Sequence, residues 1–285
     1  MSKNSQPKKT QPTETTLCFR NFLNKHSELS RIYWTHLMSS EHLRNSIVAA
    51  PPKEFTASYL NSSFPSFMHP QTIEETLSWL NTYMDRSRLH ILVVCSANLE
   101  AYLKEITRLF LLSSGHRKSS TEPFTLNSIG KALGAQILEK SSLPEPLKYA
   151  QDLFSLSLKN ELPLWNTAYK LRCAAAHNGG VVDEKTKREL ANLNLTIGDQ
   201  ISLDWEDLKS YLKCAHDIAK KIDSKLQSYE IKILESEKIL NEGKITKKLP
   251  SRKSIWTYLH ENFSINGIRN CDKEDIEHRL YSSTT

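Results

Sequence analysis

Apolar residues recur at steps of three and four along most of this chain, a spacing that gathers them on one face of an α-helix. Three stretches show it most clearly, at residues 17–47, about 87–113 and about 205–233. Each is long, and each predicted helix has an apolar face that needs a partner. The pattern therefore predicts a bundle of long helices.

Capping and turn residues separate these stretches. Pro51-Pro52 breaks the first one, and Thr72 with Glu75 three residues later forms a capping box that predicts a helix start. Asp204 is placed to cap the last long helix. Shorter helices are predicted over 126–140 and 145–158.

Pro163 suits the first position of one further helix, and Asn178-Gly179-Gly180 is a strong stop signal after it. Beyond that stop, residues 194–203 alternate between apolar and polar around Gly198-Asp199, which predicts a hairpin with a two-residue turn. The predicted fold class is all-α: a helical bundle with long antiparallel helices and one short β-hairpin.

Four regions follow from the pattern. Residues 1–16 lack apolar periodicity and are expected to be a disordered tail, and residues 17–69 form an N-terminal helical extension. Residues 70–243 form the main helical domain. Residues 244–285 comprise a basic linker and a small C-terminal helical appendage. No internal repeat is present.

Composition narrows the class further. Hydrophobic residues make up 39% of the chain, enough for a core, and only 8 Gly and 11 Pro argue against a β architecture. No apolar run approaches the roughly 18 residues of a membrane span. The charged N-terminus lacks the apolar region of a secretory signal, so a soluble, cytoplasmic protein is expected. The formal net charge of +6 suggests an anionic partner.

The five cysteines predict no metal centre. They are scattered and odd in number, no Cys-x-x-Cys pair is present, and Cys214-x-His216 alone cannot build a zinc site. A reducing compartment is the simpler interpretation, and neither a metal nor another cofactor is predicted.

One short motif carries chemistry, an arginine followed by a histidine after four to six residues. About one match is expected by chance, so the spacing alone has little value. Three pairs have an allowed spacing: Arg172–His177, Arg20–His26 and Arg31–His36. Context favours the first, because His177 lies in the last turn of a predicted helix, where the helix dipole favours a protonated imidazole.

Geometry limits how Arg172 and His177 can work together. Five residues at 100° each place the two side chains about 140° apart on a regular helix. Either the helix unwinds at Asn178, or the pair acts with groups from a second copy across a two-fold axis. The small residues Ala174 to Ala176 leave room for a large partner to approach.

The segment from Arg172 to Gly180 and the helix containing Ser96-Ala-Asn-Leu-Glu-Ala-Tyr-Leu-Lys-Glu-Ile106 resemble the HEPN superfamily, in its RNA-processing and defence branch. The resemblance covers roughly residues 70–240. It implies a metal-independent ribonuclease that acts as a homodimer, with the two motifs facing each other. One departure is Cys173, where active members often carry Asn, Asp or His.

The resemblance implies a role for each site residue. His177 would transfer a proton and Arg172 would contact the phosphate, while the 2′-OH of the RNA attacks. Glu100 would orient Arg172, although an ion pair between two helices is an equal alternative. Lys170, Asn166 and Asn178 would bind substrate phosphates, although solvated surface is the simpler interpretation.

Two functions remain open. The first is a metal-independent endoribonuclease, a toxin or anti-phage defence effector, with RNA as its partner and a regulatory protein as a possible second partner. The second is a non-catalytic HEPN-like module that binds RNA or protein, with Cys173 as the sign of lost activity.

Overall fold

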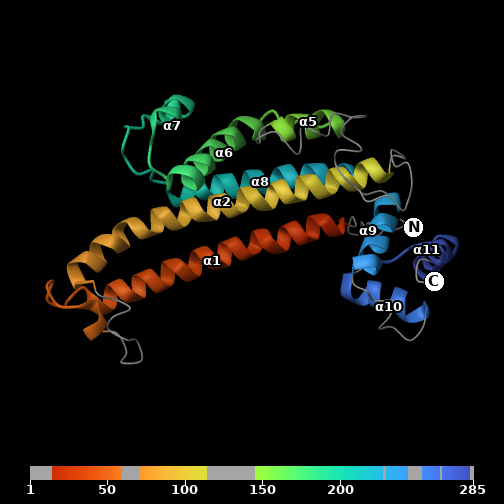
Figure 1. Cartoon of the computed structure of the whole chain (residues 1–285), viewed down its shortest axis with the longest axis horizontal. Helices are drawn as coiled ribbons and strands as arrows, with labels where there is room; N and C mark the ends of the chain where they lie inside the picture. Colours follow the sequence, from red (N-terminus) through yellow and green to blue (C-terminus); the bar gives the residue numbers. More distant parts are fainter. Residues whose placement is uncertain are drawn as a thin grey trace, which may run out of the picture. The chain divides into compact units, whose positions relative to one another are not determined.

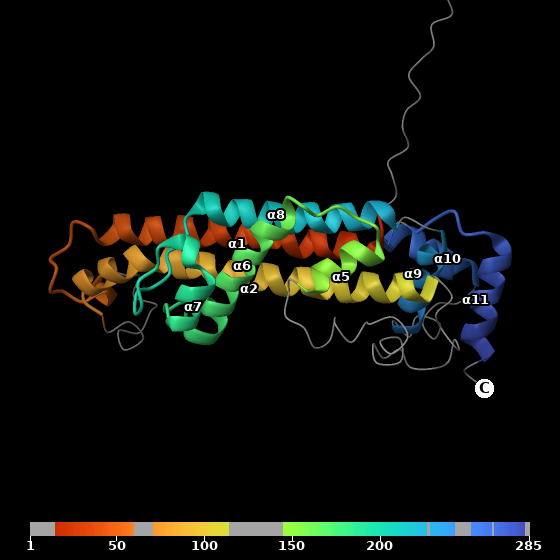
Figure 2. The ribbon, with the colours of Figure 1, turned by 90° about the horizontal axis from the view of Figure 1, so that it is seen from above.

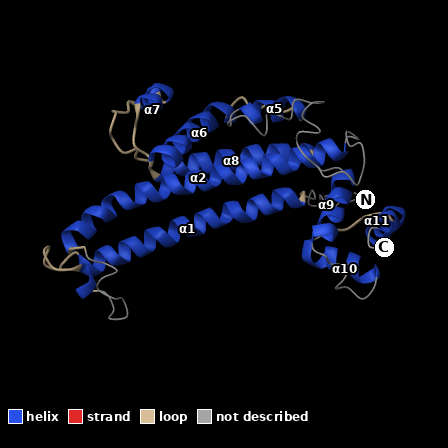
Figure 3. Cartoon of the chain, in the orientation of Figure 1, coloured by secondary structure: helices blue, strands red, loops and turns tan. Residues whose placement is uncertain are grey.

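The computed structural model describes residues 15–59, 71–113, 145–226, 229–242, 252–263 and 265–282. These residues are mostly helical, as Figure 3 shows, and the all-α prediction is confirmed for them. Two isolated antiparallel bridges, Phe55–Thr72 and Val181–Gln200, are the extended pairing present in this part of the chain. None of the described helices combines the length and apolarity needed to cross a membrane.

The elements follow one another as labelled in Figure 1. They are α1 (Leu17–Ile47), η1 (Thr56–Ser58), α2 (Ile73–Ser113), α5 (Glu145–Leu153), α6 (Glu161–Asn178), α7 (Glu184–Glu189), η3 (Ala191–Leu193), α8 (Trp205–Lys225), α9 (Tyr229–Glu242), α10 (Arg252–Phe263) and α11 (Asn270–Ser282).

Several predicted boundaries are confirmed. α1 has the predicted bounds, and the capping box is formed, since Thr72 N donates to Glu75 Oε2 at 2.8 Å and Glu75 N to Thr72 Oγ1 at 3.3 Å. Asp204 caps α8 through the Asp207 N–H at 2.7 Å. The predicted C-terminal appendage contains α10 and α11.

Other boundaries differ from the prediction. α2 is one helix of 41 residues where two were expected, because no helix breaker stands between Ile73 and Ser113. The last long helix ends at Lys225, and α9 is a separate helix. The helix predicted over 126–140, and most of the tail and of the basic linker, lie outside the described residues.

The predicted hairpin at 194–203 is not present. The Val182 N–H donates to the Asp199 carbonyl at 2.9 Å, the Gly198 N–H to the Val182 carbonyl at 2.8 Å, and the Ile201 N–H to the Gly180 carbonyl at 2.8 Å. Apart from one turn bond, from the Asp199 N–H to the Thr196 carbonyl at 3.2 Å, the alternating segment therefore pairs with the chain that follows α6.

The chain divides into two compact units. Unit 1 comprises residues 1–21, 102–140 and 220–285, and unit 2 comprises residues 22–101 and 141–219. Unit 2 thus contains residues on both sides of position 69, where the sequence suggests a boundary.

Within unit 2, α1, α2 and α8 run side by side (Figures 1 and 2). α1 is antiparallel to α2, since His36 bonds Ser87 at 2.8 Å and Arg44 bonds Asn81 at 2.8 Å. α1 also packs on α8, where the Tyr33 and Trp205 rings stack with centroids 4.3 Å apart.

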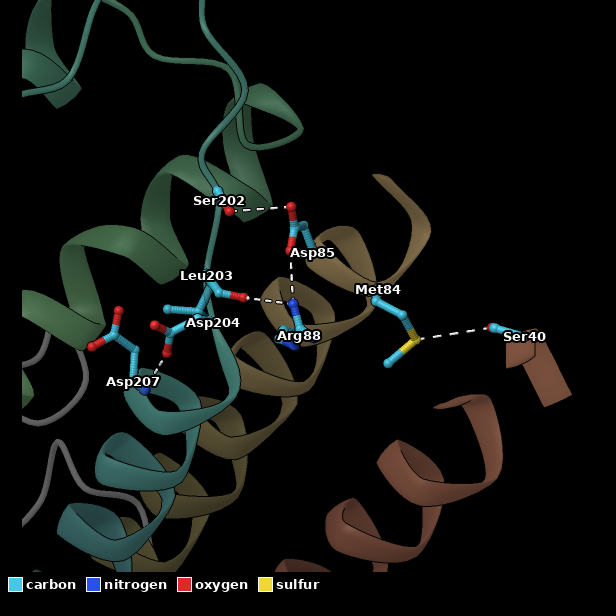
Figure 4. A network of polar contacts seen from close by, with 8 residues as sticks. All are labelled: Ser40, Met84, Asp85, Arg88, Ser202, Leu203, Asp204 and Asp207. Atoms are coloured by element: carbon cyan, nitrogen blue, oxygen red, sulfur yellow. Dashed lines mark hydrogen bonds and ion pairs between the residues drawn. The ribbon is translucent and has the colours of Figure 1, made fainter. Parts of the chain in front are cut away.

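A polar network ties the start of α8 to α2 (Figure 4). Arg88 Nη1 lies 2.7 Å from Asp85 Oδ1 and donates to the Leu203 carbonyl at 3.1 Å. Ser202 Oγ donates to the other oxygen of Asp85 at 3.1 Å. These bonds fix the segment that leads from α6 and α7 into α8.

Unit 1 has its own apolar cluster on α9, α10, α11 and the loop before α11. It consists of Ile239, Leu240, Ile255, Leu259, Ile265, Ile268 and Ile276. The first residues of α1 contribute to the same unit, where two buried carboxylates, Asp223 and Glu235, receive the N-terminus of α1.

Candidate functional site

α6 carries the Arg–His motif, and the buried face of this helix fixes its position in unit 2. Trp165, Ala168, Leu171 and Ala174 are buried at steps of three residues. Cys214 Sγ of α8 contacts the Glu161 carbonyl at the start of α6, at 3.4 Å. The helix begins two residues before Pro163 rather than at it.

The C-terminal end of α6 is closed by backbone bonds. Gly179 adopts φ 62°, the left-handed conformation that glycine adopts readily, and the N–H groups of Gly179 and Gly180 both reach the Ala174 carbonyl. Gln200 Nε2 donates to the Gly179 carbonyl at 3.0 Å. The stop signal at 178–180 is confirmed, and it holds His177 at a defined helix end.

The packing at Gly180 holds this end against α2. Its φ is 82°, and a Cβ there would overlap Gln200 Nε2 and lie 3.1 Å from Leu89 Cδ1. The closest approach between this turn and α2 therefore needs a residue without a side chain.

His177 and Arg172 lie in different environments. His177 is exposed and makes no hydrogen bond or ion pair with any described residue. Arg172 is half-buried, with its guanidinium 5.5 Å from the Tyr169 ring centroid and Nη1 3.9 Å from Cys173 Sγ. Its Nε is buried and has no hydrogen-bond partner in the described part of the chain.

The helix stays regular through Asn178, so the two side chains remain on different sides of it. Of the two ways in which they could act together, unwinding at Asn178 is absent from this structure.

Two of the predicted substrate ligands are engaged in structural bonds. Lys170 Nζ donates to the Glu189 carbonyl at the end of α7, at 2.7 Å. Asn178 Nδ2 donates to Asp183 Oδ2 at 2.6 Å, and Asp183 also caps α7 through the Thr186 N–H at 2.7 Å. Bonds to Thr186 are the main reason that the pKa of Asp183 lies below its usual value.

The remaining two predicted residues differ in their position. Asn166 is half-buried on α6, and its side chain makes no hydrogen bond with the described residues. Glu100 is half-buried on α2, and no ion pair joins it to Arg172, whose contacts are with Tyr169 and Cys173. No direct contact between Glu100 and Arg172 therefore supports the predicted orienting role of Glu100.

The competing motif histidines are engaged elsewhere. His26 is half-buried, stacks on Phe22 with centroids 5.3 Å apart and lies 6.3 Å from His216. Burial first, and then His216, lower its pKa to about 4. His36 is held by Ser87. Of the three motif histidines, His177 is the exposed one.

Sequence reasoning missed the residues that support this site. Asp183 and Gln200 hold the end of α6, and Tyr169 lies under Arg172. The spacing of Tyr169 and Arg172, three residues apart on a helix, was the signal available for the last contact. No group of three or more His, Cys, Asp or Glu in the described ranges is placed to hold a metal ion.

Comparison with known proteins gives no match to any family model, to any curated protein or to any solved structure.

Proposed function

We propose that the chain is a metal-independent endoribonuclease of the HEPN type, acting as a toxin or anti-phage defence effector. The observation that carries the proposal is the end of α6. The exposed His177 stands there at a fixed helix terminus with no side-chain partner among the described residues, and Arg172 lies five residues before it on the same helix.

The chemistry needs few groups, because RNA carries its own nucleophile. The 2′-oxygen attacks the adjacent phosphorus, the bond from phosphorus to the 5′-oxygen breaks, and the products are a 2′,3′-cyclic phosphate and a 5′-hydroxyl. His177 accepts the proton of the 2′-hydroxyl and returns it to the departing 5′-oxygen, so that the proton count is unchanged. Arg172 stabilises the charge on the pentavalent phosphorus centre through its guanidinium.

A second copy completes the proposed site. Because Arg172 and His177 lie about 140° apart on one helix, a single phosphate cannot contact both from the same copy. Ala176 is exposed and Ala175 half-buried, so the helix surface between the two side chains is small enough for another α6 to approach. Ala175→Glu is expected to weaken both dimerisation and cleavage.

The other predicted residues contribute to the proposed site in different ways. Lys170 and Asn178 support the site by holding α7 and its preceding turn against α6. Asn166 is available for a phosphate, and Glu100 supports Arg172 only in a rearranged or dimeric state. We expect Lys170→Ala to reduce cleavage less than Arg172→Ala does.

The direct test is incubation with labelled transfer RNA in EDTA. Cleavage is expected to persist in EDTA, to fail on RNA with a 2′-deoxy substitution at the cut, and to disappear in Arg172→Ala and His177→Ala. His260→Ala is a matched control, since His260 is also exposed in the last turn of a helix, α10. Cleavage that survives His177→Ala or needs a divalent ion would contradict the proposal.

The alternative is a non-catalytic module, and one contact favours it. Cys173 Sγ sits against Arg172 Nη1, where a hydrogen-bonding amide would orient a phosphate better than a thiol does. If this alternative holds, the chain binds RNA or protein without cutting RNA. Cys173→Asn would then be the variant in which cleavage appears.

A further inference from the structure

We infer that the exposed side of α1 and α2 in unit 2 binds single-stranded RNA and leads it toward the end of α6. This inference rests on the proposed function and names where its substrate lies. The α1–α2 surface is defined here by Lys25, Arg31, His36, Trp79, Tyr83 and Arg86.

The first argument is charge without partners. Lys25, Arg31 and Arg86 are exposed, and none of them forms an ion pair with a described residue. Glu28, which lies between the first two on α1, is the one carboxylate beside them in the groove. The groove on α1 thus carries two cations and one carboxylate, and Arg86 adds an unpaired cation on α2.

Three other cations of unit 2 are paired. Lys209 lies 3.1 Å from Glu206, Lys213 lies 2.6 Å from Asp217, and Arg88 lies 2.7 Å from Asp85. Lys209 and Lys213 of α8 and Arg88 of α2 are thus each neutralised by a neighbouring carboxylate, whereas Lys25, Arg31 and Arg86 are left to attract an anion.

The second argument is a line of aromatic rings. The Trp79 and Tyr83 rings have centroids 4.5 Å apart with their planes at 31°, and the His36 ring is 5.9 Å from Tyr83. Trp79 remains 41% exposed. Exposed aromatic rings next to cations are what single-stranded nucleic acid uses, because bases stack on the rings while phosphates meet the charges.

The third argument is that the cations and the aromatic rings lie on one continuous surface. A shallow groove of about 630 Å³ runs along α1 and is lined by Lys25, Arg31 and His36 among other residues. His36 links the groove to Tyr83. Groove and rings therefore form one continuous surface.

The surface also reaches the proposed site. Tyr83, Arg86 and the exposed His90 follow at steps of three and four on α2, which places them on one stripe. Leu89, next to His90, is the residue against which Gly180 packs, three residues after His177. A single-stranded RNA bound along this stripe of α2 thus reaches the end of α6.

An acidic protein segment is the other anionic occupant to consider. The groove is lined by polar side chains, including Asn24 and Thr35, and Ile32 is its one aliphatic residue. A docked protein helix would need a wider apolar seam. Stacked rings with scattered cations suit a polynucleotide better.

The test measures binding separately from cleavage. Full-length His177→Ala protein is titrated against a fluorescein-labelled single-stranded RNA of 12 nucleotides, and anisotropy is followed at several salt concentrations. Adding Trp79→Ala and Tyr83→Ala is expected to weaken binding by about tenfold or more. Adding Lys25→Ala and Arg31→Ala is expected to lower the salt slope by about 1 to 2.

Controls make the result specific. Lys209→Ala with Lys213→Ala removes two paired cations of α8 and is expected to leave RNA affinity unchanged, and Trp79→Phe is expected to retain most of it. Circular dichroism checks that every variant keeps the helical signal. Unchanged affinity in the folded Trp79→Ala, Tyr83→Ala variant overturns the inference, as does equal displacement of the RNA by poly-glutamate.

The two proposals fail in different ways. RNA binding that depends on Trp79 and Tyr83, in a protein that cuts nothing, contradicts the nuclease and supports this surface. Cleavage that needs His177 but shows an unchanged KM in the Trp79→Ala, Tyr83→Ala variant contradicts this surface alone.

Discussion

Two helix ends in this molecule carry polar groups, and their surroundings differ sharply. At the start of α1, Asp223 accepts the Thr16 N–H at 3.3 Å and the Thr16 hydroxyl, and Glu235 accepts the Cys18 N–H at 3.0 Å. Asp223 is 1% exposed. At the end of α6, His177 is exposed and has no partner among the described residues.

The difference separates a structural polar cluster from one available to a ligand. The first four N–H groups of a helix need acceptors, and buried carboxylates provide them at α1 while also meeting the positive end of the helix dipole. At the end of α6, the His177 ring and Arg172 Nε have no such partner among the described residues. Removing a group is therefore expected to cost stability at α1 and activity at α6.

The largest expected effect is on the start of α1. Asp223→Ala leaves the N–H and hydroxyl of Thr16 buried without an acceptor and should lower the free energy of unfolding by about 3 kcal/mol. Urea denaturation measures the loss. His177→Ala is the counterpart and should cost less than about 0.5 kcal/mol. Equal losses in both variants would remove the distinction between the two ends.

The next effect concerns acid. Burial and His216 lower the pKa of His26 to about 4 in the folded chain. Between that value and the unfolded pKa of about 6.5, the unfolded chain binds a proton at His26 that the folded chain does not bind. Stability is present above the unfolded value of about 6.5 and is lost as pH falls toward 4, by about 1 to 2 kcal/mol at this half-buried site.

Unfolding curves between pH 7 and pH 4 measure this loss, and His26→Phe should flatten the pH dependence. An identical profile in His26→Phe and in wild type would show that other groups control the acid response.

The smallest effect is expected at Glu235. Burial raises its pKa, against the opposing bonds from the Leu17 and Cys18 N–H groups. A raised carboxyl pKa contributes stability that is present below the unfolded value and is lost as pH rises through the folded value. Glu235→Gln keeps an acceptor for Cys18 and should remove this slope, a change opposite in sign to that at His26. Thermal unfolding at pH 4 and pH 7 compares the two.

Local signals predicted the helices well. The capping box at Thr72 and the stop at Asn178-Gly179-Gly180 act through bonds between residues a few positions apart, so a sequence displays them directly. The continuity of α2 was missed because its capping box and its clearest apolar spacing were assigned to two separate helices, although no residue between Ile73 and Ser113 breaks a helix.

Contacts between residues far apart in the chain could not be predicted from the sequence. The alternation at 194–203 is real, but its backbone partner is the turn at 180–182, and nothing in the segment itself names that partner. The bond from Thr16 to Asp223 spans 207 positions. Of the site, the sequence located Arg172 and His177, while the bonds that engage Lys170 and Asn178 depend on where α7 folds back.

The two adjacent glycines after α6 should differ in the substitutions that they tolerate as this sequence diverges. Gly179 has open space where a Cβ would stand, so asparagine, which tolerates a left-handed backbone, is an acceptable replacement there. Gly180 combines a positive φ with a Cβ position occupied by the Gln200 and Leu89 side chains, so a replacement there needs those side chains to shift as well as a strained backbone. A diverged copy that retains the turn is therefore recognised by the second glycine more than by the first, even where the residues of the motif have changed.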